Sequence, residues 1–146
     1  MAIVPDIEGE EPDVTVLARD VMSPPEVTVN PAASLDKAWR IMANTGVRYL
    51  AVETEGRCAG VAEERFIMRE WLIDPASAAH KQVKDVVHPP TLCVRPDAPL
   101  QEVAAIMAGR DIDIVPVIGE HNELLGVVTR GDVADVVGRY GLTVPR

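Results

Sequence analysis

The sequence predicts a mixed α+β fold built from two tandem copies of one β-α-β-β-α unit. The main observation is an internal repeat: with a shift of 65 residues, 12 of 34 positions are identical between 19–52 and 84–117. After one inserted residue, Gly60-Val61 aligns with Gly126-Val127. Each copy also places apolar residues first at strand spacing and then at helical spacing. Since one such unit cannot bury its apolar face alone, we expect the two copies to stack and cover each other.

The composition predicts a folded chain with an aliphatic core. The chain has 146 residues, of which 47% are hydrophobic and 25% are charged, an average mix for a globular domain. This apolar content can offset the entropy lost on folding, which excludes global disorder. Aromatic residues make up only 3%, so Val, Ala, Leu, Ile and Met must build the core.

Local signals mark the first strand and the first helix of each copy. Val27–Val29 and Leu92–Val94 are short strand candidates, each followed by a proline two residues later. Ser34 is the predicted N-cap of the first helix, and Pro99 fits the first helical position in the second copy. The apolar helical stripes are Leu35, Ala38, Trp39 and Met42 in the first copy and Leu100, Val103, Ala104 and Met107 in the second.

A hairpin and a second helix complete each copy. Apolar, β-branched runs separated by turn residues predict the hairpins. The predicted strands are Tyr49–Glu53, Arg57–Ala62, Ile112–Ile118 and Leu124–Val128, with turns at Glu55-Gly56 and Glu120–Asn122. The helices that follow are predicted at Glu64–Ile73 and at Gly131–Val137, the latter ending before Gly138.

These signals divide the chain into five parts. Residues 14–73 form the first predicted repeat and residues 84–140 the second, with residues 74–83 as the linker between them. Residues 1–13 carry five acids and no base, and we expect them to form a flexible acidic N-terminus. Residues 141–146 are expected to form a C-terminal tail.

The charge of the chain disfavours several classes of partner. Lys and Arg number 14 and Asp and Glu 23, which gives a net charge of −9. Nucleic acids and anionic membranes both attract basic surfaces, so neither is an expected partner. No apolar run approaches the roughly 18 residues of a membrane-spanning helix, and the first residues lack the pattern of a signal peptide. Together with two isolated cysteines, Cys58 and Cys93, this predicts a reducing, cytoplasmic location.

Four segments together resemble the cystathionine β-synthase (CBS) domain, and the pair of copies resembles a Bateman module. The segments are Val86–Pro90, Leu92–Leu100, Ile112–Ile118 and Leu125–Val133. The match to the family pattern is closer in the second repeat than in the first. The resemblance implies repeats related by pseudo-two-fold symmetry, a homodimer, and clefts for adenosine-containing ligands. It also implies regulation of a partner protein rather than catalysis.

The segment Thr129–Asp132 has the clearest site chemistry, at the point where a predicted strand passes into a helix. The resemblance implies that Thr129 and Asp132 contact the ribose and phosphate of the ligand. A carboxylate can accept from two ribose hydroxyls, and a hydroxyl beside free N–H groups at a helix start suits a phosphate. Arg130 adds a cation that can reach the same anion. The alternative is a capping box, in which Thr129 and Asp132 serve only the helix start.

The resemblance also implies that strand residues wall the binding site of the base. By position these residues are Val87, Leu92, Ile112, Asp113, Ile114 and Val127. For each apolar member the alternative role is core packing. Asp113 could accept a hydrogen bond from an adenine amino group, or its charge could repel a polyphosphate.

The first repeat departs from the ligand motif. Glu63 stands at the position of Thr129, and Phe66 stands at the position of Asp132. A carboxylate therefore replaces the hydroxyl that would face phosphate, and an apolar ring replaces the ribose acceptor. Although Arg65 adds a cation, we expect at most one adenosine ligand per chain, in the second repeat.

No residue pattern indicates catalysis, a metal site or a required cofactor. His80, His88 and His121 lack metal-ligand spacing. The sequence contains no nucleophile elbow, P-loop or GxGxxG string. Two functions stay open: a non-catalytic regulatory module that binds AMP, ADP, ATP or S-adenosylmethionine, and a ligand-free scaffold for dimerisation and protein interaction.

Overall fold

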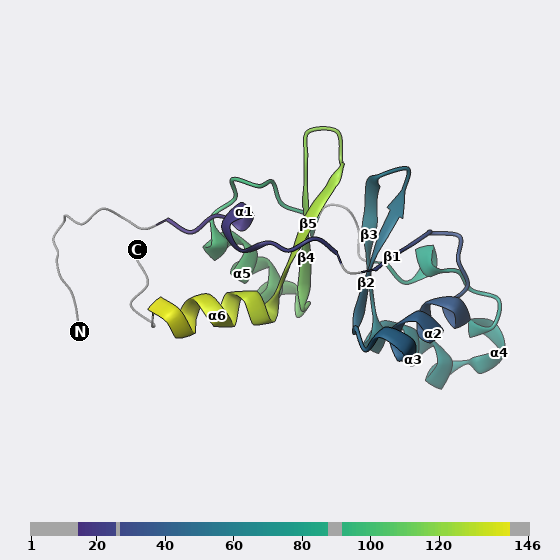
Figure 1. Cartoon of the computed structure of the whole chain (residues 1–146). Coiled ribbons are helices and arrows are strands. Elements are labelled where there is room, and N and C mark those ends of the chain that lie inside the picture. Colours follow the sequence, from purple (N-terminus) through teal and green to yellow (C-terminus); the bar gives the residue numbers. More distant parts are fainter. Residues whose placement is uncertain (1–14, 26, 88–91, 141–146) are drawn as a thin grey trace, which may run out of the picture.

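The computed structural model describes residues 15–25, 27–87 and 92–140 (Figure 1), so both predicted tails lie outside the described residues. The helices are α1 (Ala18–Val21), α2 (Leu35–Thr45), α3 (Glu64–Ile73), α4 (Pro75–Ala78), α5 (Leu100–Arg110) and α6 (Arg130–Tyr140), with a 3-10 turn, η1, at Val83–Asp85. The strands are β1 (Thr28–Val29), β2 (Tyr49–Thr54), β3 (Arg57–Glu63), β4 (Ile114–Ile118) and β5 (Leu124–Thr129). The predicted mixed α+β class is confirmed.

Two small sheets meet in the middle of the molecule. In the first, β1 runs parallel to β2 and β3 runs antiparallel to it; the second is the antiparallel pair β4–β5. Figure 1 shows the two hairpins side by side, with α2, α3 and α4 on one outer side and α5 and α6 on the other. The hairpin ends are joined, because the Cys58 N–H donates to the Asn122 carbonyl at 2.8 Å and the Leu124 N–H donates to the Gly56 carbonyl at 3.1 Å.

The elements of the first repeat follow the prediction closely. Ser34 caps α2, since its hydroxyl accepts from the Lys37 N–H at 3.0 Å. The helix ends at Gly46, whose φ of 81° lies in the left-handed region that favours glycine. Helix α3 has the predicted bounds, Glu64–Ile73.

The second repeat departs from the prediction at its first strand and helix. Within Leu92–Val94 the structure has one isolated bridge, from Val94 to Val117, instead of a strand. Pro99 is the N-cap of α5 rather than its first residue, a position that also needs no intrahelical N–H bond. Strand β4 starts at Ile114 instead of Ile112, because the left-handed Asp111, with φ 54°, ends α5 and the chain turns before it extends.

Helix α6 is longer than predicted. It begins at Arg130 and continues through Gly138 to Tyr140. Glycine inside a helix costs about 1 kcal/mol relative to alanine, which packing can outweigh. Val133 and Val136, almost one turn apart, pack against the second core and hold the helix in place.

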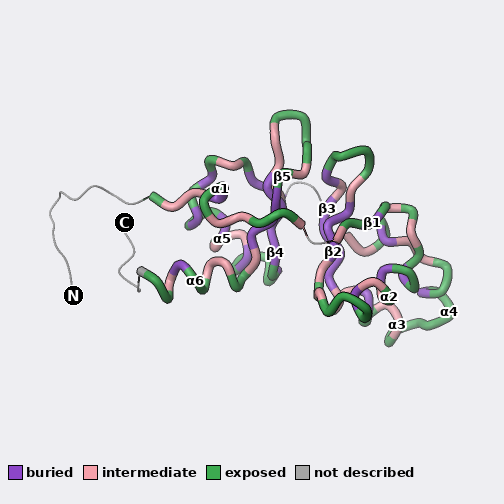
Figure 2. Tube along the Cα trace, viewed as in Figure 1, coloured by how far each residue is buried: buried purple, intermediate pink, exposed green. Residues whose placement is uncertain are grey.

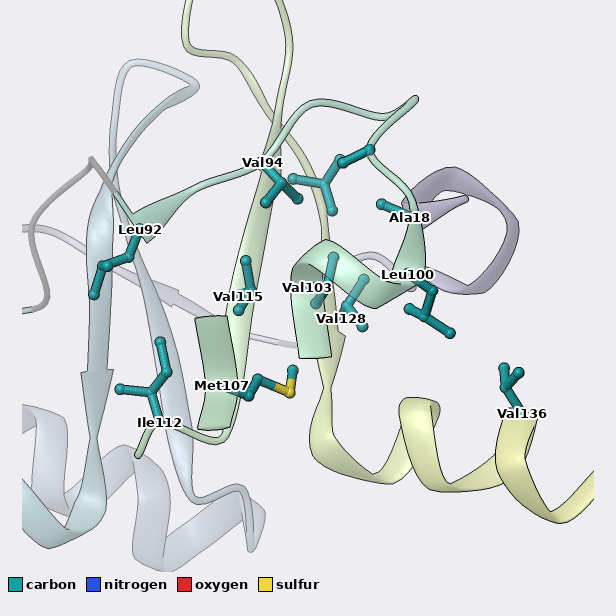
Figure 3. Packing of buried hydrophobic residues seen from close by; sticks show 12 residues of the cluster. Ala18, Leu92, Val94, Leu100, Val103, Met107, Ile112, Val115, Val128 and Val136 are labelled. Carbon is teal, nitrogen blue, oxygen red and sulfur yellow. The ribbon is translucent and has the colours of Figure 1, made fainter. Parts of the chain in front are cut away.

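The segments that lead into the two repeats are exchanged between the two cores. Helix α1 precedes the first repeat, yet it packs on the second, where Ala18 is fully buried in the same cluster as Leu100 and Val103 (Figure 3). The turn η1 precedes the second repeat and packs on the first, with Val83 fully buried. In Figure 1 the purple α1 accordingly lies among the green and yellow elements.

Equivalent hydrogen bonds hold the two exchanged segments. Written from N–H to carbonyl, they are Ala18 to Ala98 and Val83 to Ala33, both 2.8 Å, and Arg19 to Pro96 and Lys84 to Pro31, both 2.9 Å. Each donor or acceptor differs from its counterpart by 65 positions, which is the shift of the sequence repeat. The exchange is therefore reciprocal and follows the pseudo-two-fold symmetry of the repeats.

The residues predicted as a linker, 74–83, take part in the packing. Asp74 caps α4, because its carboxylate accepts from the Ser77 N–H at 3.2 Å. Ala78 of this helix is buried in the first core. The connection between the repeats is thus ordered by contacts with the first repeat.

Burial is concentrated in the strands and on the inner helix faces (Figure 2). Each repeat has its own apolar cluster, and a third, small cluster joins the two sheets. The third cluster consists of Val61, Ile114 and Val127, with Tyr49 packed against it. It forms an apolar seam between the two hairpins.

Candidate functional site

The turn from β5 into α6 forms a closed capping box. The Thr129 hydroxyl accepts from the Asp132 N–H at 3.1 Å, and Oδ2 of Asp132 accepts from the Thr129 N–H at 2.7 Å. Helix capping, the alternative role of these residues, is therefore present in the structure. A carboxylate has about four lone-pair sites, so the box leaves Asp132 with acceptor capacity for a ligand.

The side chain of Arg130 lies on the connection between α5 and β4. Its Nε donates to Oδ1 of Asp113 at 2.7 Å, and its Nη2 donates to the Ile112 carbonyl at 3.0 Å. Both charged side chains are about half exposed, so their ion pair is screened by solvent and adds little to stability. An anionic ligand must compete with Asp113 for this guanidinium group.

A pocket of about 210 Å³ lies beside Asp132, between α6 and the exchanged helix α1. Its lining residues are Asp20, Val21, Asp132, Asp135, Val136 and Arg139. The carboxylate of Asp20 is held by the Leu17 N–H, which donates to it at 2.9 Å. Three carboxylates against one guanidinium group give the pocket a negative lining. The exchange is essential to this site, because α1 supplies one of its walls.

The equivalent turn from β3 into α3 has the same backbone arrangement and different side chains. The Glu64 N–H donates to the Arg48 carbonyl at 2.9 Å. Glu63 makes no side-chain bond to the helix start. The residue is only 4% exposed, and its carboxylate lies 3.4 Å from Nε of Arg65 and accepts from the Asp113 N–H at 3.4 Å. Glu63 therefore links the first repeat to the second.

Phe66, in place of Asp132, lines a pocket of about 240 Å³ together with Arg69 and Val87. The guanidinium carbons of Arg65 and Arg69 lie 4.9 and 5.1 Å from the centre of the Phe66 ring. This is a cation–π arrangement. The first repeat thus keeps a pocket at the equivalent place, with an aromatic face where the second repeat has a carboxylate.

The residues predicted to wall the base are not gathered beside Asp132. Four are buried among other apolar side chains, Leu92 and Ile112 in the second core and Ile114 and Val127 in the seam. Val87 packs against the first core, because the segment that carries it is exchanged. Asp113 pairs with Arg130. Core packing accounts for most of these apolar residues, although Val87 also lines the pocket beside Phe66 and Leu92 lines another pocket. Their role toward a ligand stays a prediction.

Sequence reasoning missed most of the lining of the pocket beside Asp132. A signal for three of these residues exists, because Asp135, Val136 and Arg139 follow Asp132 at the spacing of one helix face. For Asp20 the sequence offers no comparable signal. Its place in this pocket depends on α1 packing against the other repeat.

The CBS domain model matches residues 18–65 and 83–139, and the chain therefore belongs to the CBS domain family. The two matches cover both repeats. The predicted tandem pair, the arrangement of a Bateman module, is thereby confirmed.

Three comparisons illustrate the likeness. The magnesium transporter MgtE of Thermus thermophilus is 30% identical over 126 residues, which are 82% of this chain and 26% of MgtE. The CBS domain pair of protein MJ0100, solved in complex with 5′-methylthioadenosine and S-adenosyl-L-methionine, has a TM-score of 0.73 at 22% identity over 86% of this chain and 98% of that one. The cytosolic domain of MgtE, solved with ATP, has a TM-score of 0.65 at 28% identity over 82% and 48%. The chain spans about a quarter of the length of most curated relatives it matches, MgtE among them.

Two further observations concern the described part of the chain. None of its helices is long and apolar enough to cross a membrane. In the same residues, no group of three or more His, Cys, Asp or Glu side chains could hold a metal ion. The polar side chains of the turn and of the pocket beside Asp132 are carboxylates, the Thr129 hydroxyl and guanidinium groups.

Proposed function

We propose that the chain is a non-catalytic regulatory module, which binds an adenosine-containing ligand beside Asp132 and thereby changes its contacts with a partner protein. The observation that supports this function best is the pocket between α1 and α6, with Asp132 of the family motif in its wall. The ligands bound by MJ0100 and by MgtE support the adenosine class. A ligand shifts a conformation only by its differential affinity for the two states. Because α1 leads directly into the first repeat, a ligand against α1 can bias the position of one repeat relative to the other.

The charges of the pocket indicate which adenosine compounds fit it. Asp20, Asp132 and Asp135 face a single guanidinium group, that of Arg139. A polyphosphate would add negative charge to this site, and like charges brought together cost binding free energy. Ribose hydroxyls, in contrast, donate to carboxylates, and the sulfonium group of S-adenosylmethionine carries a positive charge. We therefore expect S-adenosylmethionine and 5′-methylthioadenosine to bind more tightly than AMP or ATP.

Calorimetry with these four compounds tests the proposal. Asp132→Asn removes the charged acceptor and should weaken the best ligand by roughly ten- to a hundred-fold, the loss expected for a hydrogen bond to a charged group. Glu120→Gln is the matched control, since it makes the same charge change at an exposed residue of the β4–β5 turn. We expect one site per chain. If the parent binds none of the four compounds, the ligand-binding function is wrong.

A ligand-free scaffold is the second candidate function, because the capping box at Thr129 and Asp132 is complete without a ligand.

For either function we propose a homodimer. Helices α2 and α3 carry an apolar groove of about 250 Å³ that includes Trp39 and Trp71, and Leu72 beside them is 78% exposed. Light scattering should give twice the chain mass of 15.8 kDa. A monomer at micromolar concentration would contradict the dimer. The free thiols suit a reducing cytoplasm, where we place the protein.

A further inference from the structure

The two cysteines of the chain, 35 positions apart in sequence, meet where the two repeats join. Cys58 lies on β3 and is buried, whereas Cys93 precedes Val94 and is partly buried. Both thiols are free, and a side-chain hydrogen bond links them. A pair of thiols in contact, each from a different repeat, has no role in the capping box or in the pocket beside Asp132.

The backbone holds both cysteines against the same hairpin, β4–β5. The Cys58 N–H donates to the Asn122 carbonyl at 2.8 Å in the turn of this hairpin. Next to Cys93, Val94 forms a parallel bridge with Val117 of β4. Figure 3 shows the chain running from Leu92 toward this hairpin, which it reaches at Val94. Backbone attachments thus hold the segments of both cysteines to the same hairpin.

The two thiols differ in acidity. The hydrogen bond with Cys93 lowers the pKa of Cys58 to about 7, against the opposing effects of burial and of Glu53. The Gly60 N–H, 3.3 Å from the Cys58 sulfur, also lowers this pKa. The hydrogen bond with Cys58, together with burial, raises the pKa of Cys93. Of the two thiols, Cys58 is therefore the one that ionises first near neutral pH, and Cys93 can then donate the hydrogen bond to its thiolate.

We propose that Cys58 and Cys93 form a redox modification site, which closes a disulfide between the two repeats when hydrogen peroxide is present. The Cys58 thiolate attacks one peroxide oxygen; an S–O bond forms, the O–O bond breaks, and hydroxide leaves and is protonated to water. The Cys93 sulfur then attacks the Cys58 sulfenic acid. The S–S bond forms, the S–O bond breaks, and the departing hydroxide takes the Cys93 proton as a second water. Each sulfur loses one electron, and these two electrons reduce the peroxide.

The burial of Cys58 favours a small oxidant, because its residue is only 8% exposed. Peroxide is small enough to reach such a sulfur, whereas a bulky disulfide is hindered. The disulfide would tie β3 of the first repeat to the segment before Val94 in the second. This site does not depend on an adenosine ligand, and it is tested without one.

The experiment treats the reduced full chain with one equivalent of hydrogen peroxide, removes the excess with catalase, and alkylates the unfolded protein with iodoacetamide. We expect an intact mass lower by two hydrogen atoms with no alkyl group added, and a peptide map that links Cys58 to Cys93 within one chain. Dithiothreitol should restore both thiols. The oxidised form should melt at a higher temperature than the reduced form, because the cross-link restricts the unfolded chain.

Two variants test the order of the steps, after circular dichroism has confirmed that each is folded. In Cys93→Ser the sulfenic acid at Cys58 has no resolving thiol, so dimedone should trap it. In Cys58→Ser, Cys93 should stay unmodified at the same dose of peroxide. Two alkylated thiols in the treated parent, or disulfides only between chains, would overturn the site. Equal reactivity of the two variants would overturn the assignment of Cys58 as the attacking group.

Discussion

The two turns that begin α3 and α6 have the same backbone arrangement and different side-chain chemistry. In both, the first helical N–H donates to a carbonyl at 2.9 Å, Glu64 to Arg48 and Arg130 to Asp113. The second turn closes a box between Thr129 and Asp132. The first turn buries a carboxylate that reaches across to the other repeat. The fold thus fixes the path of the chain, and the side chains at these turns are free to serve either a ligand site or the contact between repeats.

Gly126→Ala should lower the free energy of unfolding more than any other change described below. The added methyl group would push the segment after α1 away from the second repeat. A Cβ at this position would lie 2.9 Å from the Ser23 carbonyl oxygen and 3.0 Å from the Met22 sulfur. The Ser23 backbone cannot move away without breaking its bonds to Val127, at 2.8 and 3.0 Å. We expect a loss of about 3 kcal/mol in the free energy of unfolding, at the upper end for overpacking. Chemical denaturation measures it.

Gly138→Ala is the matched control for this change. Apart from its chain neighbours and the backbone of its own helix, no atom of the described residues lies within 4 Å of a Cβ built on Gly138, and the residue is inside α6. Alanine should therefore stabilise the protein by about 0.5–1 kcal/mol. Equal losses in the two variants would show that Gly126 is not required for close packing.

Glu63→Ala should have the next largest effect and should act on the contact between the repeats. The change leaves the Asp113 N–H without this carboxylate and removes one partner of Arg65. Since Arg65 is 41% exposed in its side chain, it stays solvated and the cost is limited to about 2 kcal/mol. Thermal unfolding measures the loss. A change of less than about 0.5 kcal/mol, typical of surface substitutions, would contradict the structural role of Glu63.

Thr129→Ala should lower the free energy of unfolding by less, about 1 kcal/mol, which is the usual contribution of an N-cap side chain. It removes the acceptor of the Asp132 N–H in the second turn. Ser34→Ala removes a cap of the same kind in the first repeat and should cost a similar amount. If Thr129→Ala leaves the denaturation midpoint unchanged while Ser34→Ala lowers it, Thr129 does not stabilise α6.

The smallest expected effect is a shift in the titration of Cys58, measured by the ultraviolet absorbance of its thiolate. In the parent this thiolate should form with a midpoint near pH 7. Cys93→Ala removes the hydrogen-bond donor that lowers the pKa most, while burial still raises it. The midpoint should therefore rise, with less thiolate at neutral pH and more only in alkaline solution. An unchanged midpoint would show that Cys93 does not set the acidity of Cys58.

Most elements of the fold could be predicted because their signals are local. Ser34, the Glu55-Gly56 turn and the start of α3 depend on residues that are neighbours in sequence. The exchange of α1 and η1 could not be predicted in this way. The apolar pattern of a leading segment is the same whether it packs on its own repeat or on the other.

The candidate site could be predicted only where it is local. The Thr129–Asp132 turn has a short motif, and the structure shows the geometry of the capping alternative. Apolar strand residues such as Ile114 and Val127 carry no signal that separates a ligand wall from a packed seam. Asp20 lines the pocket only because α1 packs beside α6, which is far from it in sequence. A single sequence carries no local signal for such a contact.

The exchange of α1 and η1 makes each repeat an incomplete folding unit. A chain cut within residues 74–80 would give an N-terminal fragment without Val83 and a C-terminal fragment without Ala18, and each would have a gap in its apolar cluster. Mixing the fragments would fill both gaps at once. The intact protein should accordingly unfold in one cooperative transition, although its sequence contains two repeats.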